Sequence, residues 1–405
     1  MGEEQKMSVG VCVINRNGIA LAADSAGTFS PNKMFYNSVN KLFSLSPNNA
    51  CAAIIYGNLS VYNISVEQII KEFSIHLDSQ QPLKDFYDIV ACFKEFLRNK
   101  YKYYKFDVSA DHYCKQVISA YIDVWGKKIQ LVADEDDAKN KIITILKGVN
   151  LAVNLSSKIS DFDIEKYIIA NYEHFFDIEI NKAVPDIDAF PNEKKKLWKY
   201  ICDVFRFEQP LINDSKTGIF FAGYGVNDAY PKFISIDLYK IINGELKYKI
   251  KDKCEAINNY AEIKPLAQED VIYTFCKGIS DEYISAISSE IDSIIKEKIR
   301  GLSPSFTEVH KKELLATFAN CKKQVNNKIS EISRTKHINP IIESVKLISL
   351  SEMAFLAENL VNMTSLKRTY CLDGQQQTVG GPTDVAVISK GDGFVWVKNK
   401  NTLEI

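Results

Sequence analysis

Short apolar runs separated by polar turns open and close the chain. Residues 8–14 and 19–24 are small or β-branched apolar runs on either side of Asn15-Arg-Asn-Gly18. Runs of this length around turn residues predict β-hairpins, and the Asn-Gly pair favours a type I′ turn, which needs positive φ at both central positions. The first sheet is therefore predicted to be antiparallel. The other predicted strand pairs are residues 41–45 with 51–56, 217–224 with 231–238, and 383–389 with 394–398.

Elsewhere the apolar residues recur every three or four positions, which predicts amphipathic helices. In residues 64–77, for example, Ile69 and Phe73 share one helical face. Residues 281–301 and 306–333 are predicted to form a long helical hairpin. The remaining predicted helices are residues 83–104, 266–277 and 350–365, with helical stretches near 160–182 and 192–206.

Residues 116–125 and 128–133 are rich in β-branched and aromatic side chains around Gly126, which predicts one more strand pair. Antiparallel strands with helices grouped between them predict an α+β fold of two stacked antiparallel sheets with helices on their outer faces. The predicted parts are an N-terminal leader at 1–7, a core at 8–133, 216–278 and 346–405, a helical insertion at 134–215, and a helical hairpin insertion at 279–345.

The charge balance limits the classes of partner. The chain has 405 residues, 46% of them hydrophobic, which is ample for a large core. Its 50 basic and 51 acidic residues give a net charge of -1, which argues against broad binding to nucleic acid. No apolar run is long enough to cross a membrane, and Met1–Lys6 lacks the apolar centre of a secretory signal. A cytoplasmic location without membrane contact is expected.

No metal site or cofactor is expected. The nine cysteines are odd in number and none forms a C-x-x-C pair, which favours free thiols, several of them buried, in a reducing compartment. The five histidines lie far apart in the sequence. No glycine-rich phosphate loop with its lysine is present, since Gly391-Asp-Gly393 lacks both the lysine and the following helix.

Four residues of the N-terminal strands carry candidate chemistry. Ser8 opens the first strand and Asp24 ends the second, whereas Lys41 opens the third and Gly57 ends the fourth. Each has a structural alternative: a strand-end cap for Asp24, a surface lysine for Lys41 and a turn residue for Gly57. Their order along the chain favours a shared site.

This order resembles the proteasome β-subunit family, including its bacterial relatives. In that family the first strand starts with a nucleophilic Thr, Ser or Cys, and the second ends in Ala-Ala-Asp-Ser. Ser8 matches the nucleophile, and Ala22-Ala-Asp24-Ser25 matches the strand end. Lys41, followed by Leu42, matches the lysine, and Gly57 matches the glycine whose amide helps to hold the oxyanion. The resemblance implies the four-layer αββα sandwich of N-terminal-nucleophile hydrolases.

Two later segments also resemble the family. Ala222-Gly-Tyr224 with Phe233–Asp237 is similar to its middle strand pair, and Gly380-Gly381 with Asp384–Ile388 is similar to the start of its closing hairpin. Two family elements differ. Gln375–Val379 stands where an Asp and a Ser usually precede the closing Gly-Gly, and the Gly-Ser-Gly element is not found between 250 and 268.

The resemblance implies a serine-type peptidase or amidohydrolase that cleaves peptide or other amide bonds. Its base is the α-amine of Ser8, whose reference pKa of about 7.7–8.0 suits proton transfer near neutrality. Ser8 must then be the first residue of the mature chain, after translation from Met7 and removal of that methionine, or after self-cleavage at Met7–Ser8. The family commonly forms rings, so a homo-oligomer is expected.

Two alternatives stay open at this stage. One is a catalytically inactive proteasome-like scaffold or interaction protein that uses the insertions at 134–215 and 279–345 as surfaces for protein partners. The other is an amidase of the same type that acts on a small metabolite. The resemblance offers nothing to select its substrate.

Overall fold

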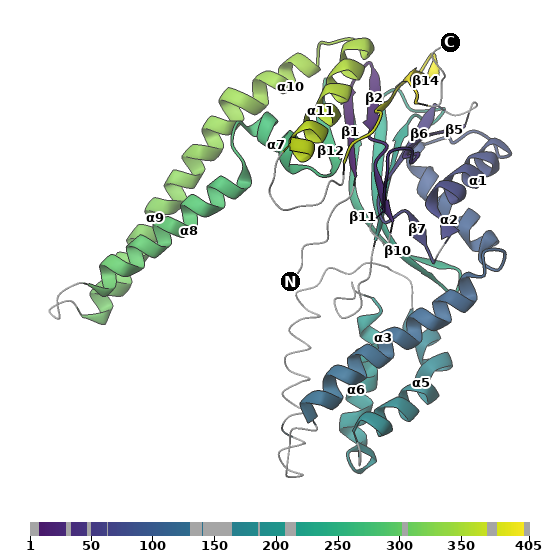
Figure 1. Cartoon of the computed structure of the whole chain (residues 1–405), viewed down its shortest axis with the longest axis vertical. Helices are drawn as coiled ribbons and strands as arrows, with labels where there is room; N and C mark the ends of the chain where they lie inside the picture. The colour runs from purple at the N-terminus through teal and green to yellow at the C-terminus, as the bar shows by residue number, and fades with distance from the viewer. Residues whose placement is uncertain are drawn as a thin grey trace. The chain divides into compact units, whose positions relative to one another are not determined.

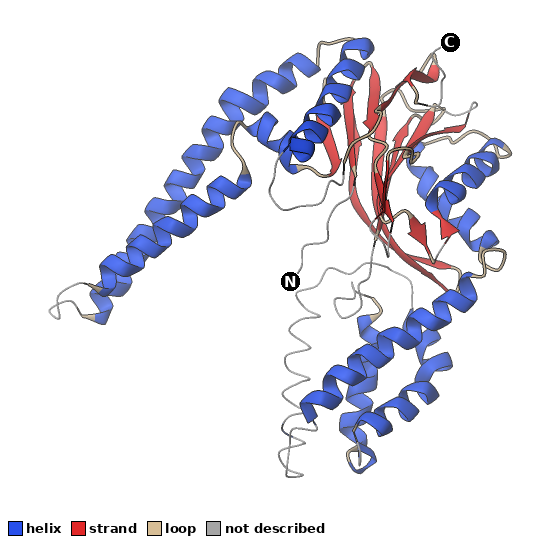
Figure 2. Cartoon of the chain, viewed as in Figure 1, coloured by secondary structure: helices blue, strands red, loops and turns tan. Residues whose placement is uncertain are grey.

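The structure is a computed structural model that describes residues 8–29, 34–46, 50–62, 64–129, 140, 164–184, 187–206, 216–301, 307–370 and 379–400. Within these ranges the predicted α+β fold is confirmed: two antiparallel sheets are accompanied by helices and helical insertions (Figures 1 and 2). The described strands are β1 (Val9–Asn15), β2 (Gly18–Ala23), β3 (Gly27–Phe29), β4 (Met34–Tyr36), β5 (Leu42–Ser46), β6 (Cys51–Gly57), β7 (Ser60–Val61), β8 (Ile64–Ser65), β9 (Thr217–Gly223), β10 (Lys232–Ile242), β11 (Glu245–Glu255), β12 (Glu262–Ala267), β13 (Asp384–Ser389) and β14 (Gly393–Lys398).

Four of the five predicted strand pairs and most predicted helices are confirmed. In the described residues the larger sheets have the orders β12-β1-β2-β13-β14 and β11-β10-β9-β6-β5, and the pairs β3-β4 and β7-β8 form small ribbons. The described α-helices are α1 (Val66–Asp78), α2 (Ile89–Lys100), α3 (Phe106–Ile129), α5 (Ile164–Ala183), α6 (Pro191–Val204), α7 (Asp270–Lys277), α8 (Asp281–Arg300), α9 (Glu308–Ile332), α10 (Asn339–Val345) and α11 (Leu350–Tyr370). Short 3-10 helices span Phe86–Asp88 and Ile187–Ala189, and a π-helix spans Ser333–Ile338.

The chain divides into two compact units. The first unit comprises Met1–Tyr56, Ala222–Lys232 and Glu255–Ile405, and the second comprises Gly57–Phe221 and Phe233–Cys254. None of the helices in the described ranges is long and apolar enough to cross a membrane.

The first unit buries both faces of its sheet. Every residue of β1 and β2 is buried, as expected for strands covered on two sides. One face packs against α11, where Met353 and Leu360 join a core with Val11 and Ala22. The other face lies close to β6, because a Cβ added at Gly10 would lie 3.4 Å from Ile54 Cγ2. A helical layer and strands of both sheets are thus stacked within this unit.

The turn between β1 and β2 differs from the predicted type I′ geometry. Asn15 pairs with Gly18, so Arg16 and Asn17 form the turn and Gly18 opens β2. The Asn15 side chain accepts a hydrogen bond from the Asn17 backbone N–H at 2.8 Å, which closes the turn without Gly18. Gly18 (φ 153°) is needed for packing instead, since an added Cβ would lie 2.4 Å from the Ile388 carbonyl oxygen.

The predicted strand pair at 116–125 and 128–133 is wrong. Residues through Ile129 belong to α3, and residues 130–133 lie outside the described part of the chain. Val117, Tyr121 and Trp125 recur every four residues and are buried against α5 and α6. The helical spacing of these side chains and their tertiary packing outweigh their preference for strands.

The predicted helix at 266–277 begins later than expected. Residues through Ala267 belong to β12, and α7 starts at Asp270. Helix α11 begins after a serine cap: Ser349 Oγ accepts from the Glu352 N–H at 3.3 Å, and the Glu352 carboxylate accepts from the Ser349 N–H at 2.8 Å. This reciprocal capping box defines the start of the helix that covers β1 and β2.

Aromatic packing forms the core of the second unit beside its strands. Phe73 of α1 and Phe93 of α2 lie edge to face, with ring centroids 5.0 Å apart. Both rings also contact Phe221 of β9, at 6.3 and 5.6 Å. Helices α3, α5 and α6 form a separate cluster in the same unit, with Phe176 against Trp198 at 4.9 Å. The predicted helical stretches near 160–182 and 192–206 are thus present as α5 and α6.

Candidate active site

The Asp24 carboxylate lies at the end of β2 with its side chain fully buried. Its Oδ1 accepts from the Val9 N–H at 3.0 Å and from Lys41 Nζ at 2.6 Å. Its Oδ2 accepts from the Ala26 N–H at 3.3 Å and the Gly380 N–H at 3.2 Å. Four donors around one carboxylate compensate for the loss of water around its charge.

Lys41, just before β5, is the cation of this buried pair. Its side chain is 1% exposed. Burial lowers the pKa of Lys41, the neighbouring Asp24 carboxylate opposes this shift, and the Lys400 ammonium adds to it. A buried ammonium is stabilised mainly by its counter-ion. Removing either Lys41 or Asp24 would therefore leave the other charge buried without compensation.

Ser8 lies at the start of β1 and is 1% exposed. Its hydroxyl has no hydrogen-bond partner among the residues that the structure describes. Its carbonyl oxygen accepts from the Gln268 N–H at 3.2 Å, and the next residue, Val9, both donates to Asp24 and accepts from the Asp24 N–H at 3.1 Å. The backbone at Ser8 and Val9 is thereby fixed beside the Asp24–Lys41 pair.

Gly57 ends β6 and belongs to the second unit. Its φ of 78° is in the left-handed region, and an added Cβ would lie 2.9 Å from the Lys216 carbonyl oxygen. Glycine is therefore required at this position by the backbone itself. The role of Gly57 as an oxyanion donor stays a prediction from the resemblance.

The segment after the closing Gly-Gly is tied to the end of β2. Ser25 donates its hydroxyl to the Pro382 carbonyl at 2.7 Å and its N–H to the Gly380 carbonyl at 3.3 Å. With the bond from Gly380 to Asp24, these contacts hold the C-terminal segment against the N-terminal strands. Residues 375–378 of the segment in which the sequence departs from the family lie outside the described residues.

A second buried lysine–carboxylate pair lies next to the first, and the sequence had given no sign of it. Asp384 begins β13 and pairs across the sheet with Ala23, the neighbour of Asp24. Lys400 binds Asp384 through both its Nζ and its N–H, and the two side chains are only 6% and 4% exposed. The run Asp384–Ile388 was conspicuous in the sequence, but its ammonium partner follows β14 and carries no motif.

No group of three or more His, Cys, Asp and Glu side chains that could hold a metal ion occurs within the described ranges. The predicted burial of free thiols is confirmed for Cys12, Cys51, Cys114 and Cys202, whereas Cys321 is exposed on α9. The side chains of Ser8, Lys41 and Asp24 supply a hydroxyl, an ammonium and a carboxylate.

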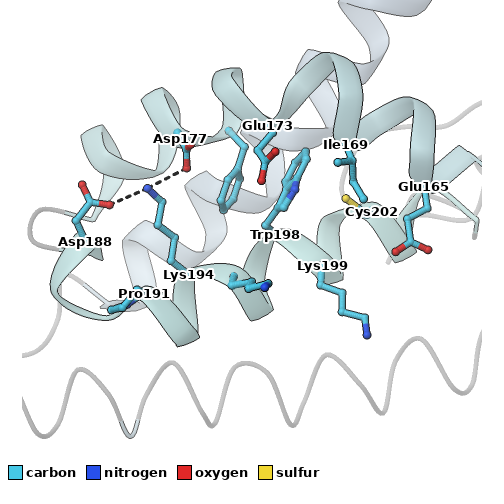
Figure 3. A pocket seen from close by; sticks show the side chains of 12 residues that line it. Glu165, Ile169, Glu173, Asp177, Asp188, Pro191, Lys194, Trp198, Lys199 and Cys202 are labelled. Atoms are coloured by element: carbon cyan, nitrogen blue, oxygen red, sulfur yellow. Dashed lines mark hydrogen bonds and ion pairs between the residues drawn. The ribbon is translucent and has the colours of Figure 1, made fainter.

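The second unit contains a pocket of about 770 Å³ between α5 and α6 (Figure 3). At one end Lys194 Nζ lies between two carboxylates, 2.9 Å from Asp177 and 2.7 Å from Asp188. Trp198 lines the wall, and its indole N–H has no partner among the described residues. Sequence reasoning missed this pocket because its charged residues recur at ordinary helical spacing, which is typical of a solvated face.

Comparison with known proteins gives a distant structural likeness. No family model matches the chain, and no curated protein matches it. Among solved structures, the chain is similar to Anbu proteins. The Gly-1 mutant of Anbu from Hyphomicrobium sp. strain MC1 aligns at 9% identity and a TM-score of 0.35, covering 96% of this chain and 85% of that one.

Two further Anbu structures give similar values. Anbu (ancestral beta-subunit) from Yersinia bercovieri aligns at 9% identity and a TM-score of 0.35, covering 97% of this chain and 87% of that one. The helical assembly of the Anbu complex from Pseudomonas aeruginosa aligns at 8% identity and a TM-score of 0.36, covering 98% and 88%.

Proposed function

We propose that this protein is an N-terminal-nucleophile hydrolase of the proteasome β-subunit type, which cleaves peptide or other amide bonds with Ser8 as nucleophile. One observation carries the proposal: Lys41 Nζ and the N–H of Val9, the residue that follows Ser8, meet on the same buried oxygen of Asp24. A buried ion pair tied to the backbone beside a buried serine, whose hydroxyl has no partner among the described residues, is costly for stability alone, and such groups concentrate at functional sites.

In the proposed reaction Ser8 Oγ attacks the carbonyl carbon of the amide while its proton passes to the α-amine of Ser8. The resulting oxyanion is held by a backbone N–H, the role that the resemblance assigns to Gly57, worth about 3 kcal/mol of the barrier. The carbon–nitrogen bond then breaks, and the amine returns the proton to the leaving nitrogen. Water attacks the acyl ester with the same amine as base, which releases the acid and restores Ser8.

Lys41 supports this chemistry through its charge and its burial. Its ammonium favours the negative charge that develops on Ser8 Oγ during attack. Because burial lowers the pKa of Lys41, it releases a proton more readily than a lysine in water, and it can relay protons at the site. Asp24 keeps Lys41 in position and holds the backbone of the nucleophile at Val9.

The amine is free only when Ser8 begins the chain. In the sequence Met7 precedes Ser8, so the peptide bond between them must be absent in the active form, through a start at Met7 and removal of that methionine or through self-cleavage. The family resemblance further implies a homo-oligomer in the bacterial cytoplasm, with peptides or other amides as substrates.

The test is labelling of protein that begins at Ser8. A β-lactone that acylates N-terminal Ser or Thr is added, and intact mass and peptide mapping locate the adduct. We expect one adduct on Ser8, none in Ser8→Ala, labelling in Ser8→Thr, and at least about a 100-fold slower reaction in Lys41→Met. Folded protein that begins at Ser8 and stays unlabelled would overturn the proposal.

The pocket between α5 and α6 favours a second candidate, a catalytically inactive scaffold that binds partners through its helical insertion. A mixed-charge pocket with an indole N–H that has no partner among the described residues suits recognition of a polar ligand. A measurable amidase activity that is lost in Ser8→Ala would exclude this candidate. Retained ligand binding in Ser8→Ala, lost in Lys194→Glu, would support it.

A further inference from the structure

We propose that one face of the α8–α9 hairpin is an interface with a second copy of this chain, with α8 of one copy packed on α9 of the other. The hairpin face consists of Tyr283, Ile287 and Ile294 of α8 with Phe318, Val325 and Ile332 of α9. These six side chains are between 39% and 69% exposed. The proposal deepens the proposed self-association and needs no catalytic activity, so it and the Ser8 labelling can fail separately.

The hairpin leaves its apolar side chains half-buried or exposed, with Ile299 as the exception. Helices α8 and α9 run side by side over their length (Figure 1). The 25 residues of α9 include no buried residue, and α8 buries only Ile299. Two long helices without a buried core rarely hold together in water, because most helical stability comes from packing of an apolar face.

The contacts between the two helices fix their register and orientation. Ser288 Oγ donates to Asn326 Oδ1 at 3.3 Å, and Lys322 Nζ lies 2.6 Å from an Asp292 carboxylate oxygen. These side chains therefore define the sides that face each other. At 100° per residue, the exposed apolar rows are rotated away from these sides in the same sense on both helices. Since the helices are antiparallel, the same sense places both rows on one side of the hairpin.

The two rows also match in height. The helices are antiparallel, and Ser288 lies level with Asn326. Each residue further along α8 therefore lies level with one residue earlier in α9. Tyr283 then lies level with Ile332, Ile287 with Val325, and Ile294 with Phe318, each within about two residues, or about 3 Å of rise. Consider a second copy related by a two-fold axis that lies between the two hairpin faces and runs parallel to the helices. This axis brings the α8 row of each copy opposite the α9 row of the other. Every apolar side chain then meets another at its own height.

Charge complementarity selects a second copy as the occupant. Helix α8 carries five acidic and three basic side chains, whereas α9 carries three acidic and five basic ones. The half-turn that aligns the apolar rows also places the acidic helix of each copy on the basic helix of the other. Glu290 on α8 and Lys328 on α9 flank the hairpin face and lie about 6 Å apart in height across the interface. Self-complementarity of this kind is what a two-fold interface requires.

The test is the association state of the full chain by sedimentation equilibrium over a wide range of concentrations. We expect self-association of the wild type, with a dissociation constant raised at least about 100-fold by Ile294→Glu with Phe318→Glu. If the wild type forms a larger ring, this variant should form a smaller assembly, because the contact between hairpins is lost and the other contacts remain. The matched control is Val309→Glu, 65% exposed near the start of α9 and outside the face, which should associate as the wild type does.

Exchanging the two charges distinguishes a specific interface from non-specific hydrophobic association. Glu290→Lys alone and Lys328→Glu alone should each weaken association about three- to tenfold, and the double variant should restore it. Circular dichroism checks that each variant keeps its helices. A monomeric wild type, or association that the face variants leave unchanged, would overturn the proposal.

Discussion

Two lysines, Lys41 in the first unit and Lys194 in the second, have similar partners and opposite properties. Each lies within 3 Å of a carboxylate oxygen. Burial lowers the pKa of Lys41 despite its bond to Asp24. Burial also acts to lower the pKa of Lys194, but that side chain is less buried, and Asp188 and Asp177 together outweigh the effect and raise its pKa. The difference teaches that the loss of solvent, rather than the presence of an ion pair, decides the direction in which the pKa of each lysine shifts.

The largest expected effect comes from breaking the buried pair. Asp24→Asn leaves Lys41 buried without a counter-charge, and this change should lower the free energy of unfolding by about 3–5 kcal/mol. Chemical denaturation of the full chain measures it. Asp188→Asn, at the exposed pair, is the matched control and should leave the unfolding midpoint nearly unchanged. A small effect of Asp24→Asn would show that Lys41 is not held in the buried state.

An intermediate effect is expected in the pH dependence of stability. The folded-state pKa of Lys41 is lowered, so the unfolded chain binds more protons between that pKa and 10.5, and stability should rise with pH in this window. The raised pKa of Lys194 gives the opposite sign: its contribution is present below 10.5 and is lost as pH rises through the folded-state pKa.

Denaturation curves of Lys41→Met and Lys194→Met at increasing alkaline pH isolate these two contributions. Relative to Lys41→Met, the wild type should gain stability as the pH approaches 10.5 from below. Relative to Lys194→Met, it should lose stability above that value. Slopes of the same sign in both comparisons would contradict the distinction between the two lysines.

The smallest effect is expected from removing the exposed pair itself. Lys194→Met breaks contacts to Asp177 and Asp188, whose side chains are 46% and 66% exposed. Solvent screens such pairs, so the thermal midpoint should change by less than about 3 °C. Differential scanning calorimetry measures the change. A larger loss would mean that Lys194 organises the α5–α6 pocket.

Local patterns in the sequence predicted most strands of the sheets. The runs that form β1 with β2, β5 with β6, and β13 with β14 each lie next to their partners, so a short turn determines the pairing. β11 was missed because lysines alternate with its apolar residues, although Asn243-Gly244 before it provides the positive-φ turn that was expected after β1. Helix α3 was mistaken for strands because its β-branched residues suit either state until α5 packs against them.

The candidate site was predictable only in its N-terminal half. Ser8, Asp24 and Lys41 lie in a short stretch whose order carries the family resemblance, and the structure pairs the last two directly. The amide of Gly380 and the ammonium of Lys400 reach the site from the far end of the chain. No local spacing relates them to Asp24, because that relation exists only after the strands have assembled into a sheet.

The hydrogen bond from the Gly380 N–H to Asp24 joins positions 356 residues apart. The Asp24 carboxylate is buried, and Gly380 is one of the four donors that replace its water. This donor arrives only once the segment before β13 has folded back onto β2. A polypeptide that stopped short of Gly380 would leave the carboxylate with one hydrogen bond fewer, so the N-terminal ion pair depends on a distant segment for its full solvation.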